Sequence, residues 1–357
     1  MTDIRPIPKD QIRIFSREGN PIAQINAHAE RSWVVGDEGR ALFTYASRDV
    51  RVVAEEVLQF GNWILIENSE IPIPWVGVID TPRRWSSRAL TVHCYDPVHV
   101  FGWRRGGQEA TYTAESAGSL CNTLLTKVNE QEATILRAGT IWTGGKNVEV
   151  AIRPAPLTHF VRDLVLSSGE EYQWRPVVDT KGRLTVYMDW AKSVGVETSA
   201  IFQEGKKGGN MELVEDEYVE DGPIENDVMG YGDGATWDTK PKVTLVDDDS
   251  RKKYGLRQTG VEFVGVSSPD AVRAGTQTYL DRAKNPAEIF NLAVINRGDT
   301  FKVIGMGNRV RVVASSVGFH ADGGRGKLAK VRILGAHYDP ALKTRMSLTV
   351  QTEVIVV

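Results

Sequence analysis

A run of carboxylates without any neighbouring cation is the feature of this sequence that most suggests chemistry. Between residues 208 and 239 there is no lysine or arginine. The same stretch contains a dense group of acidic residues: Glu212, Glu215, Asp216, Glu217, Glu220, Asp221, Glu225 and Asp227. Because like charges repel one another and stay hydrated, a solvated loop or an edge strand is the plainest interpretation of this run.

Three functional interpretations compete with the solvated loop. A calcium loop would need alternating Asp or Asn ligands, a glycine and a glutamate at its twelfth position, and this spacing is absent. The consecutive Asp247, Asp248 and Asp249 do not reproduce it either. A pair of glycosidase carboxylates is compatible with the composition. The third interpretation is an electronegative surface that repels passing DNA, since it is the neutralisation of phosphates that creates affinity for DNA.

Histidine and cysteine give little support for a metal site or a nucleophile. The tightest group of candidate ligands is His93, Cys94, Asp96 and His99, but adjacent residues of a strand point to opposite faces. None of the six histidines lies in an HExxH motif or beside a CxxC pair. No GxSxG motif occurs, and the short GxG strings do not extend to GxGxxG. The sequence therefore predicts no catalytic residue, no cofactor site and no metal site.

The tryptophans are a second candidate for binding. Trp75, Trp85 and Trp103 could form a sugar-stacking platform, which would make the chain a host-glycan-binding protein. Tryptophan in a strand-rich chain more often fills a core or an interface. The spread of the others favours core positions for Trp142, Trp174, Trp190 and Trp237.

Length and charge exclude several classes of protein. The 357 residues are enough for two or more domains. A net charge of -3 argues against sequence-independent binding of nucleic acid, which needs a basic surface. No stretch approaches the roughly 20 apolar residues that span a bilayer. The first residues have no secretory signal and there are two cysteines, so we expect synthesis in a reducing cytoplasm.

Short strands separated by turns dominate the first hundred residues. Turn signals recur every eight to twelve residues or so around β-branched runs, which is typical of a barrel or a sandwich. The expected strands include residues 12–15, 33–35, 41–43, 63–66, 76–79 and 90–94.

Helical periodicity follows in the middle of the chain. One helical face is formed by Ala117, Leu120, Cys121, Leu124, Leu125 and Val128. A second helix should begin at Pro156 and end at Gly169, and a hairpin should then join residues 177–178 to 184–187. A third helix should begin with Ser268 as its cap and end near Pro286. Strands return at 301–304, 310–313, 331–334 and 347–350.

Four passages, taken in order, resemble the tail-tip hub proteins of long-tailed phages, which share a fold with the trimeric baseplate hubs of contractile tails and injection systems. Residues 61–66 and 75–80 resemble the hub pattern of a strand, a loop and a second strand. Residues 225–232 resemble an Asn-containing strand that ends in glycines. The third passage is residues 254–255, followed by a helix that contains Leu280 and by Pro286, which opens a strand. The fourth is residues 298–301, together with Gly305 and residues 310–312.

The resemblance implies a β-rich α+β fold with two β-barrel domains like those of tail tubes. The first barrel would take residues 1–105 and an α+β domain residues 106–210. The second barrel would join 211–245 to 296–357 around a helical insert at 246–295. The chain ends at Val357 without the lysozyme, peptidase or LysM-like region of larger hubs, so we expect no enzymatic activity.

The resemblance also implies a function and partners. The chain would be a structural protein of the virion, made in the host cytoplasm and assembled as a homotrimer at the tail tip. It would join the tail tube or distal tail protein to tip, fibre or spike proteins, and let the tape measure protein and DNA pass. In that ring we expect the acidic Glu212, Glu215, Glu217 and Glu220 to face the lumen or its rim, where they would keep DNA from sticking.

Overall fold

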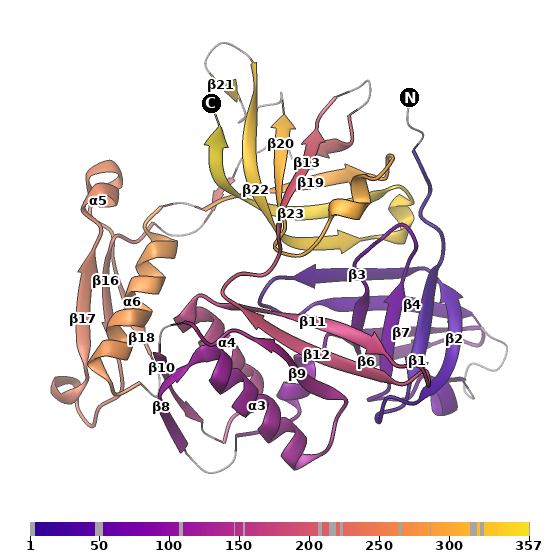
Figure 1. Cartoon of the computed structure of the whole chain (residues 1–357), viewed down its shortest axis with the longest axis horizontal. Coiled ribbons are helices and arrows are strands. Elements are labelled where there is room, and N and C mark those ends of the chain that lie inside the picture. Colours follow the sequence, from indigo (N-terminus) through magenta and orange to yellow (C-terminus); the bar gives the residue numbers. More distant parts are fainter. Residues whose placement is uncertain are drawn as a thin grey trace.

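We describe the fold from a computed structural model of the chain. The description covers residues 4–46, 53–106, 110–145, 147–152, 154–205, 209–213, 219–221, 224–263, 266–285, 287–314, 320–321 and 325–356. Within these ranges, no helix has both the length and the apolar content needed to cross a bilayer. The chain folds into one large sheet of 15 strands, three smaller sheets and several helices (Figure 1).

The first half of the large sheet comes from the N-terminal part of the chain, and we call it the N-half. Its strands pair antiparallel in the order β2-β1-β5-β6-β7-β4-β3. They are β1 (Asp10–Phe15), β2 (Pro21–Ala27), β3 (Ala29–Val34), β4 (Arg40–Ala46), β5 (Trp63–Glu67), β6 (Trp75–Trp85) and β7 (Ala89–Tyr95). A short π-helical turn, Val53–Val57, lies between β4 and β5.

The central strands of the N-half are buried on both faces. In β5, Ile64 and Ile66 enter one apolar core, whereas Trp63 and Leu65 enter a second core on the opposite face. This double burial explains why β5 reads as a continuous apolar run, since a strand covered on one face alternates apolar and polar residues.

An α+β unit builds the second core against the N-half. It consists of α2 (His99–Gly102), β8 (Ala110–Ser116), α3 (Ala117–Gln131), β9 (Leu136–Ile141), β10 (Asn147–Ile152), α4 (Leu157–Ser168), β11 (Glu171–Val178) and β12 (Leu184–Ala191). Strands β11, β12 and β9 form one sheet, and β8 pairs with β10.

The sequence patterns that predicted two helices and a hairpin in this unit are confirmed. The predicted apolar stripe of α3 is buried, and the Ser116 hydroxyl accepts a hydrogen bond from Ser119 N–H at its start. Helix α4 follows Pro156 and ends at Gly169, whose φ of 74° is the left-handed conformation that favours glycine. The predicted hairpin is the antiparallel pair of β11 and β12.

The second half of the large sheet, the C-half, is drawn mostly from the end of the chain. Its strands are β13 (Glu197–Gln203), β14 (Met211–Leu213), β15 (Val219–Asp221), β19 (Ala287–Ile295), β20 (Arg309–Ala314), β21 (His320–Ala321), β22 (Arg325–Tyr338) and β23 (Arg345–Val356). The order runs β14-β19-β23-β22, with β20 also beside β22 and β13 beside β20. Single turns of 3-10 helix occupy Thr300–Val303 and Pro340–Leu342.

The strand expected at residues 301–304 is wrong. Residues Thr300–Val303 form a 3-10 turn because Phe301 is buried while the Thr300 hydroxyl donates back to the Arg297 carbonyl oxygen at 2.6 Å. The ion pair between Lys302 and Asp299, three residues apart, also suits a helical turn.

A small unit is inserted in the C-half between β15 and β19, and we call it the insert. It contains β16 (Asp227–Tyr231), a 3-10 turn at Trp237–Thr239, β17 (Lys242–Val246), α5 (Asp248–Tyr254), β18 (Gln258–Glu262) and α6 (Pro269–Ala283). Helix α6 begins at its predicted cap, Ser268. The insert differs from the helical segment expected at 246–295, because β16 and β17 join β18 in a separate sheet, whereas β19 pairs with β23 in the large sheet.

The insert packs on the α+β unit. Helix α6 lies against α4 and β10 (Figure 1). The buried carboxylate of Glu149 in β10 accepts hydrogen bonds from the Ser267 hydroxyl at 2.7 Å and the Ser268 N–H at 2.8 Å, at the start of α6. These bonds tie the insert to the middle of the chain.

The strand-rich α+β class is confirmed, but the described strands of a single chain do not close into a barrel. The regions expected to be two barrels form two halves of one continuous sheet. Their shared apolar core contains residues of both halves, including Ile12, Trp33, Phe43, Phe202, Val310 and Leu348.

Candidate functional site: the seam between the two half-sheets

The seam at which the two halves pair is the defining feature of the large sheet. Strand β3 changes partners along its length: its first three residues pair with β4, and residues 31–34 pair antiparallel with the end of β22. Figure 1 shows β3 at the top of the N-half, below the C-half. One chain therefore contains a complete edge-to-edge contact between its N-half and its C-half.

A buried ion pair lies at the seam. The Arg31 guanidinium is 2.9 Å from the Asp10 carboxylate, and both side chains are fully buried. It also lies 5.4 Å from the ring of Trp33 and 5.1 Å from that of Tyr338, its cross-strand neighbour in β22. Burial lowers the pKa of Arg31, and the Asp10 charge opposes this effect. Sequence reasoning missed Arg31, because nothing in the AERSWV segment distinguishes it from a surface arginine.

A second ion pair joins the α+β unit to the C-half. Arg332 of β22 donates two hydrogen bonds to the carboxylate of Glu171 in β11, and both side chains are mostly buried. The N–H of Val194 also donates to that carboxylate, at 2.8 Å. Beside them Gly195 has a φ of 85°, and a side chain there would collide with the backbone of Gly307. The two units therefore meet backbone to backbone.

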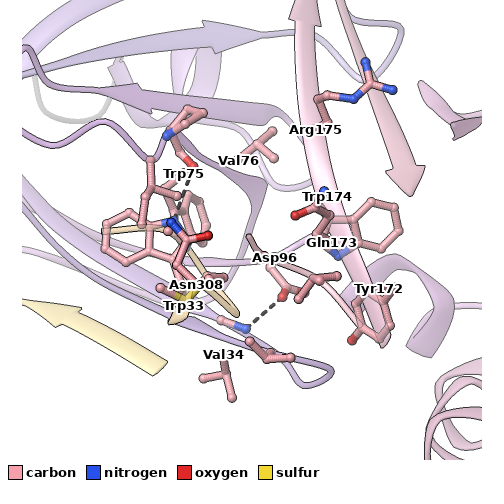
Figure 2. A pocket seen from close by; sticks show the side chains of 18 of the residues that line it. Trp33, Val34, Trp75, Val76, Asp96, Tyr172, Gln173, Trp174, Arg175 and Asn308 are labelled. Carbon is pink, nitrogen blue, oxygen red and sulfur yellow. Dashed lines mark hydrogen bonds between the residues drawn. The ribbon is translucent and has the colours of Figure 1, made fainter. Parts of the chain in front are cut away.

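A cavity of about 650 Å³ lies where the N-half, the α+β unit and the C-half meet. Figure 2 shows Trp33 and Trp75 on one side and the β11 residues Tyr172 to Arg175 on the other, with Asp96 between them. The Asp96 carboxylate accepts hydrogen bonds from the backbone N–H groups of Gly39 at 2.8 Å and Val98 at 3.0 Å. Burial nevertheless raises the pKa of Asp96 to about 8.

Of the acidic residues singled out in the sequence, Glu212 and Glu220 lie on strands at one end of the large sheet. Glu212 is on β14 and forms an ion pair with Arg345 at 2.6 Å, so its charge is partly compensated. Glu220 is on β15, and both strands pair with β19. Glu215 and Glu217 lie outside the described residues. The sequence allows either a solvated loop or an edge strand for this run, and the pairing of β14 and β15 with β19 fits an edge strand.

The group around His93 does not form a metal site. Among the residues that the structure describes, no three His, Cys, Asp or Glu side chains are placed to hold a metal ion. Cys94 is buried, as is Cys121, and burial raises the pKa of both thiols. His99 instead lies between two carboxylates, 2.6 Å from Glu38 and 2.9 Å from Asp80.

The three tryptophans of the alternative sugar-binding interpretation do not share an exposed platform. Trp75 is only 2% exposed, and its indole N–H donates to the Ser32 carbonyl oxygen inside the core. Trp85 and Trp103 are exposed, so they do not share a surface with the buried Trp75. The expectation that four other tryptophans are core residues is correct for Trp190 and partly correct for Trp174, which packs against the second core while partly exposed. It is wrong for Trp142 and Trp237, which are 41% and 54% exposed.

Solved tail proteins have a similar structure. A prophage tail protein from Listeria monocytogenes has a TM-score of 0.58 at 11% identity, over 96% of this chain and 94% of that one. A tail protein from Neisseria meningitidis has a TM-score of 0.56 at 14% identity, over 96% of each chain. An Escherichia coli type VI secretion component, itself similar to bacteriophage T4 tail proteins, has a TM-score of 0.51 at 12% identity, over 99% and 77%.

These likenesses define the fold. No protein-family profile matches the sequence, and no curated protein matches it significantly. The chain has the fold of phage tail proteins, so the resemblance to the tail-tip and baseplate hub fold is confirmed.

Proposed function

We propose that this chain is a structural hub of a bacteriophage tail tip, present in the virion as a ring of three copies. The likeness to tail proteins supports this role, because it extends over more than nine tenths of both chains in the Listeria and Neisseria examples. We propose no enzymatic activity.

The seam between β3 and β22 is the observation that carries the proposal. One chain contains two half-sheets side by side, so three chains would present six related units. Such a ring has pseudo-sixfold symmetry and would match a sixfold tail tube while keeping a threefold face for the tip. Each half-sheet would act as one barrel-like unit, closed by its neighbours in the ring and not by its own strands.

The free edges of the half-sheets would be covered in such a ring. Among the described strands, β2 pairs only with β1, and β13 only with β20. Their sequences, PIAQINA and ETSAIFQ, hold a single charged residue between them, although exposed edges are commonly protected by charge. Pairing between copies would cover these edges, and cyclic closure would keep the pairing from running on as a fibre.

The division of the chain then follows the sheets. We assign residues up to about 105 to the N-half unit, about 106–192 to the α+β unit, and 193–221 with 287–357 to the C-half unit. The insert takes residues 224–285. Of these four, the two half-sheet units would build the ring wall, and the α+β unit with the insert would lie against it.

The proposed partners are the tail tube or distal tail protein, the tape measure protein, and tip, fibre or spike proteins, with DNA only in transit. We keep the proposal that part of the acidic run, with Glu212, Glu215, Glu217 and Glu220, faces the lumen or its rim. A structure of the assembled ring with all four on the outer wall would contradict it.

The copy number tests the proposed function. Negative-stain imaging and native mass spectrometry of the purified chain, and of tail tips that contain it, should give rings of three. The isolated chain could need its tube partner to nucleate the ring, so the count in the tail tip decides. Six identical copies or a single copy would contradict the hub.

A further inference from the structure

A smaller cavity, of about 330 Å³, lies between the N-half and the α+β unit, and we call it the small pocket. Its lining includes the buried apolar side chains of Trp63, Val78 and Val100. Phe60 and Trp103 also line it and are 38% and 40% exposed, so they form its aromatic rim. The volume is at the lower end of the range for ligand pockets, which suits a single ring-sized group.

Both aromatic rings of the rim are held in place by neighbouring side chains. The Trp103 indole N–H donates to the Asp80 carboxylate at 3.1 Å, and the indole meets the His99 ring edge-on at 5.7 Å. The Arg83 guanidinium lies 3.7 Å from the centroid of the Phe60 ring and donates hydrogen bonds to two backbone carbonyl oxygens. Because both rings are ordered before a ligand arrives, little conformational entropy is lost on binding.

The small pocket also contains charged groups of both signs. Arg17 donates one N–H to the Phe60 carbonyl oxygen at 3.1 Å and forms no ion pair in the part of the chain that the structure describes. Gly61, with a φ of 80°, lies beside this guanidinium, and a Cβ atom there would come within 2.9 Å of the Arg17 Nε. Arg104 and Glu132 line the pocket as an ion pair at 2.6 Å. The pocket therefore offers hydrogen-bond donors, a carboxylate acceptor and one cation without a compensating anion.

We propose that the small pocket binds one acidic pyranose, a sugar ring that carries a carboxylate, from a polysaccharide of the host surface. The weakly positive C–H groups of the ring would pack on the negative faces of Phe60 and Trp103. The sugar carboxylate would pair with the Arg17 guanidinium. Hydroxyl groups both donate and accept hydrogen bonds, so they suit the pair of Arg104 and Glu132. The site lies within one chain and does not depend on the ring; only the source of the sugar rests on the proposed function.

Two other ligands could use an aromatic rim and a cation, and the observations favour them less. Single-stranded DNA stacks its bases on aromatic rings, but each nucleotide also brings a phosphate, and Arg104 is already paired with Glu132. A carboxylate side chain of a partner protein needs only donors, so it would leave both rings and the acceptor unused. The experiment separates these two ligands from the acidic sugar.

A matched pair of sugars tests the site in the full-length chain. Methyl β-D-glucuronide and methyl β-D-glucoside differ only at C6, which is a carboxylate in the first and a hydroxymethyl group in the second. NMR titration of the wild type should show the glucuronide binding about 10-fold more tightly than the glucoside. Arg17→Gln should remove this preference by lowering the affinity for the glucuronide alone. Trp103→Ala should weaken the binding of both sugars about 3- to 10-fold.

Two control variants change the same residue types outside the pocket. Trp142→Ala removes a tryptophan that is 41% exposed, and Arg88→Gln neutralises an exposed arginine. Both should leave the affinities for the two sugars unchanged. Thermal unfolding of every variant checks that it folds. Arg17→Gln changes only an exposed side chain, so its result stands even where Trp103→Ala destabilises the chain.

Each contrary outcome overturns a separate part of the argument. Equal affinities of the wild type for the two sugars, or a preference that Arg17→Gln retains, would overturn the site. Acetate that binds as tightly as the glucuronide would reduce it to a carboxylate contact, and binding of oligothymidylate without the glucuronide would assign it to DNA; both results overturn the sugar. A trimeric ring that binds no sugar would contradict the pocket alone. Glucuronide binding by a chain present in one or six copies at the tail tip would support the pocket and contradict the hub.

Discussion

The two halves of the large sheet share one core but differ in what covers their second face. In the N-half, β5 is covered by the shared core on one side and by the α+β unit on the other. In the C-half, β23 buries Met346, Leu348 and Val350 on one face only, and the residues between them are partly exposed. The sequence reflects this difference, since WILI in β5 is apolar throughout and RMSLTV in β23 alternates.

The open face of the C-half is held together by exposed ion pairs. Arg309 lies 2.9 Å from Glu353, and Lys330 lies 2.8 Å from Glu197. Such pairs contribute little to stability, so this face is available for a neighbour at small cost. The comparison indicates that both faces of the central N-half strands are covered within the chain. The second face of the C-half would be covered only by a neighbouring copy in an assembly.

The largest effect should come from breaking the ion pair at the seam. Asp10→Ala leaves the Arg31 charge buried without a partner, so we expect a loss of about 3–5 kcal/mol in the free energy of unfolding, measured with urea. Arg13→Ala removes a partly exposed ion pair of the same strand and should cost less than about 1 kcal/mol. Equal losses would show that the seam does not depend on Asp10.

The difference between the halves predicts a smaller effect for a matched pair of leucines. Leu65→Ala opens a cavity between the N-half and the α+β unit, so we expect about 2–4 kcal/mol of destabilisation. Leu334→Ala, at a partly exposed site in β22, should cost less than about 1 kcal/mol. Denaturant unfolding of both variants measures this contrast, and similar costs would contradict the idea of an open C-half face.

The contact between the α+β unit and the C-half should have an intermediate effect. Arg332→Gln and Glu171→Gln each remove a charge-assisted pair, so we expect each to cost about 2 kcal/mol. The double variant should cost clearly less than the sum, because both changes break one interaction. Additive losses in thermal unfolding would mean that the two residues act independently.

The smallest effect should be a pH dependence from His99. Burial lowers the pKa of His99, but the hydrogen bonds to Glu38 and Asp80 outweigh this and raise the pKa above its usual 6.5. Both ring nitrogens must carry a proton to donate to two carboxylates. The stabilisation is therefore complete below pH 6.5 and is lost as the pH rises through the raised value.

Thermal unfolding across this pH range, with an NMR titration of the imidazole, measures the His99 effect. His99→Gln should remove the decline in stability. His93→Gln is the control, since burial and the nearby Arg84 lower the pKa of His93. A normal or lowered pKa for His99 would contradict the arrangement of two carboxylates around the ring.

The sequence by itself determined the elements whose signals are local. The stripe of α3, the Pro156 and Gly169 boundaries of α4 and the Ser268 cap of α6 depend on residues within a few positions of each other. Helix α5 could have been found in the same way, because Asp247 caps it and three cations, Arg251, Lys252 and Lys253, lie in its last turn. The order of motifs along the chain also carried the resemblance to the hub fold.

Only the tertiary structure decided which strands meet. Strands β16 and β17 resemble those of the large sheet in composition, yet they pair with β18, because α6 covers that small sheet. The burial of Arg31 depends on Asp10, 21 positions earlier, and on Tyr338 at the far end of the chain. Strand pairing and charge burial are set by contacts between distant segments, and a local pattern of residues does not identify the segment with which it pairs.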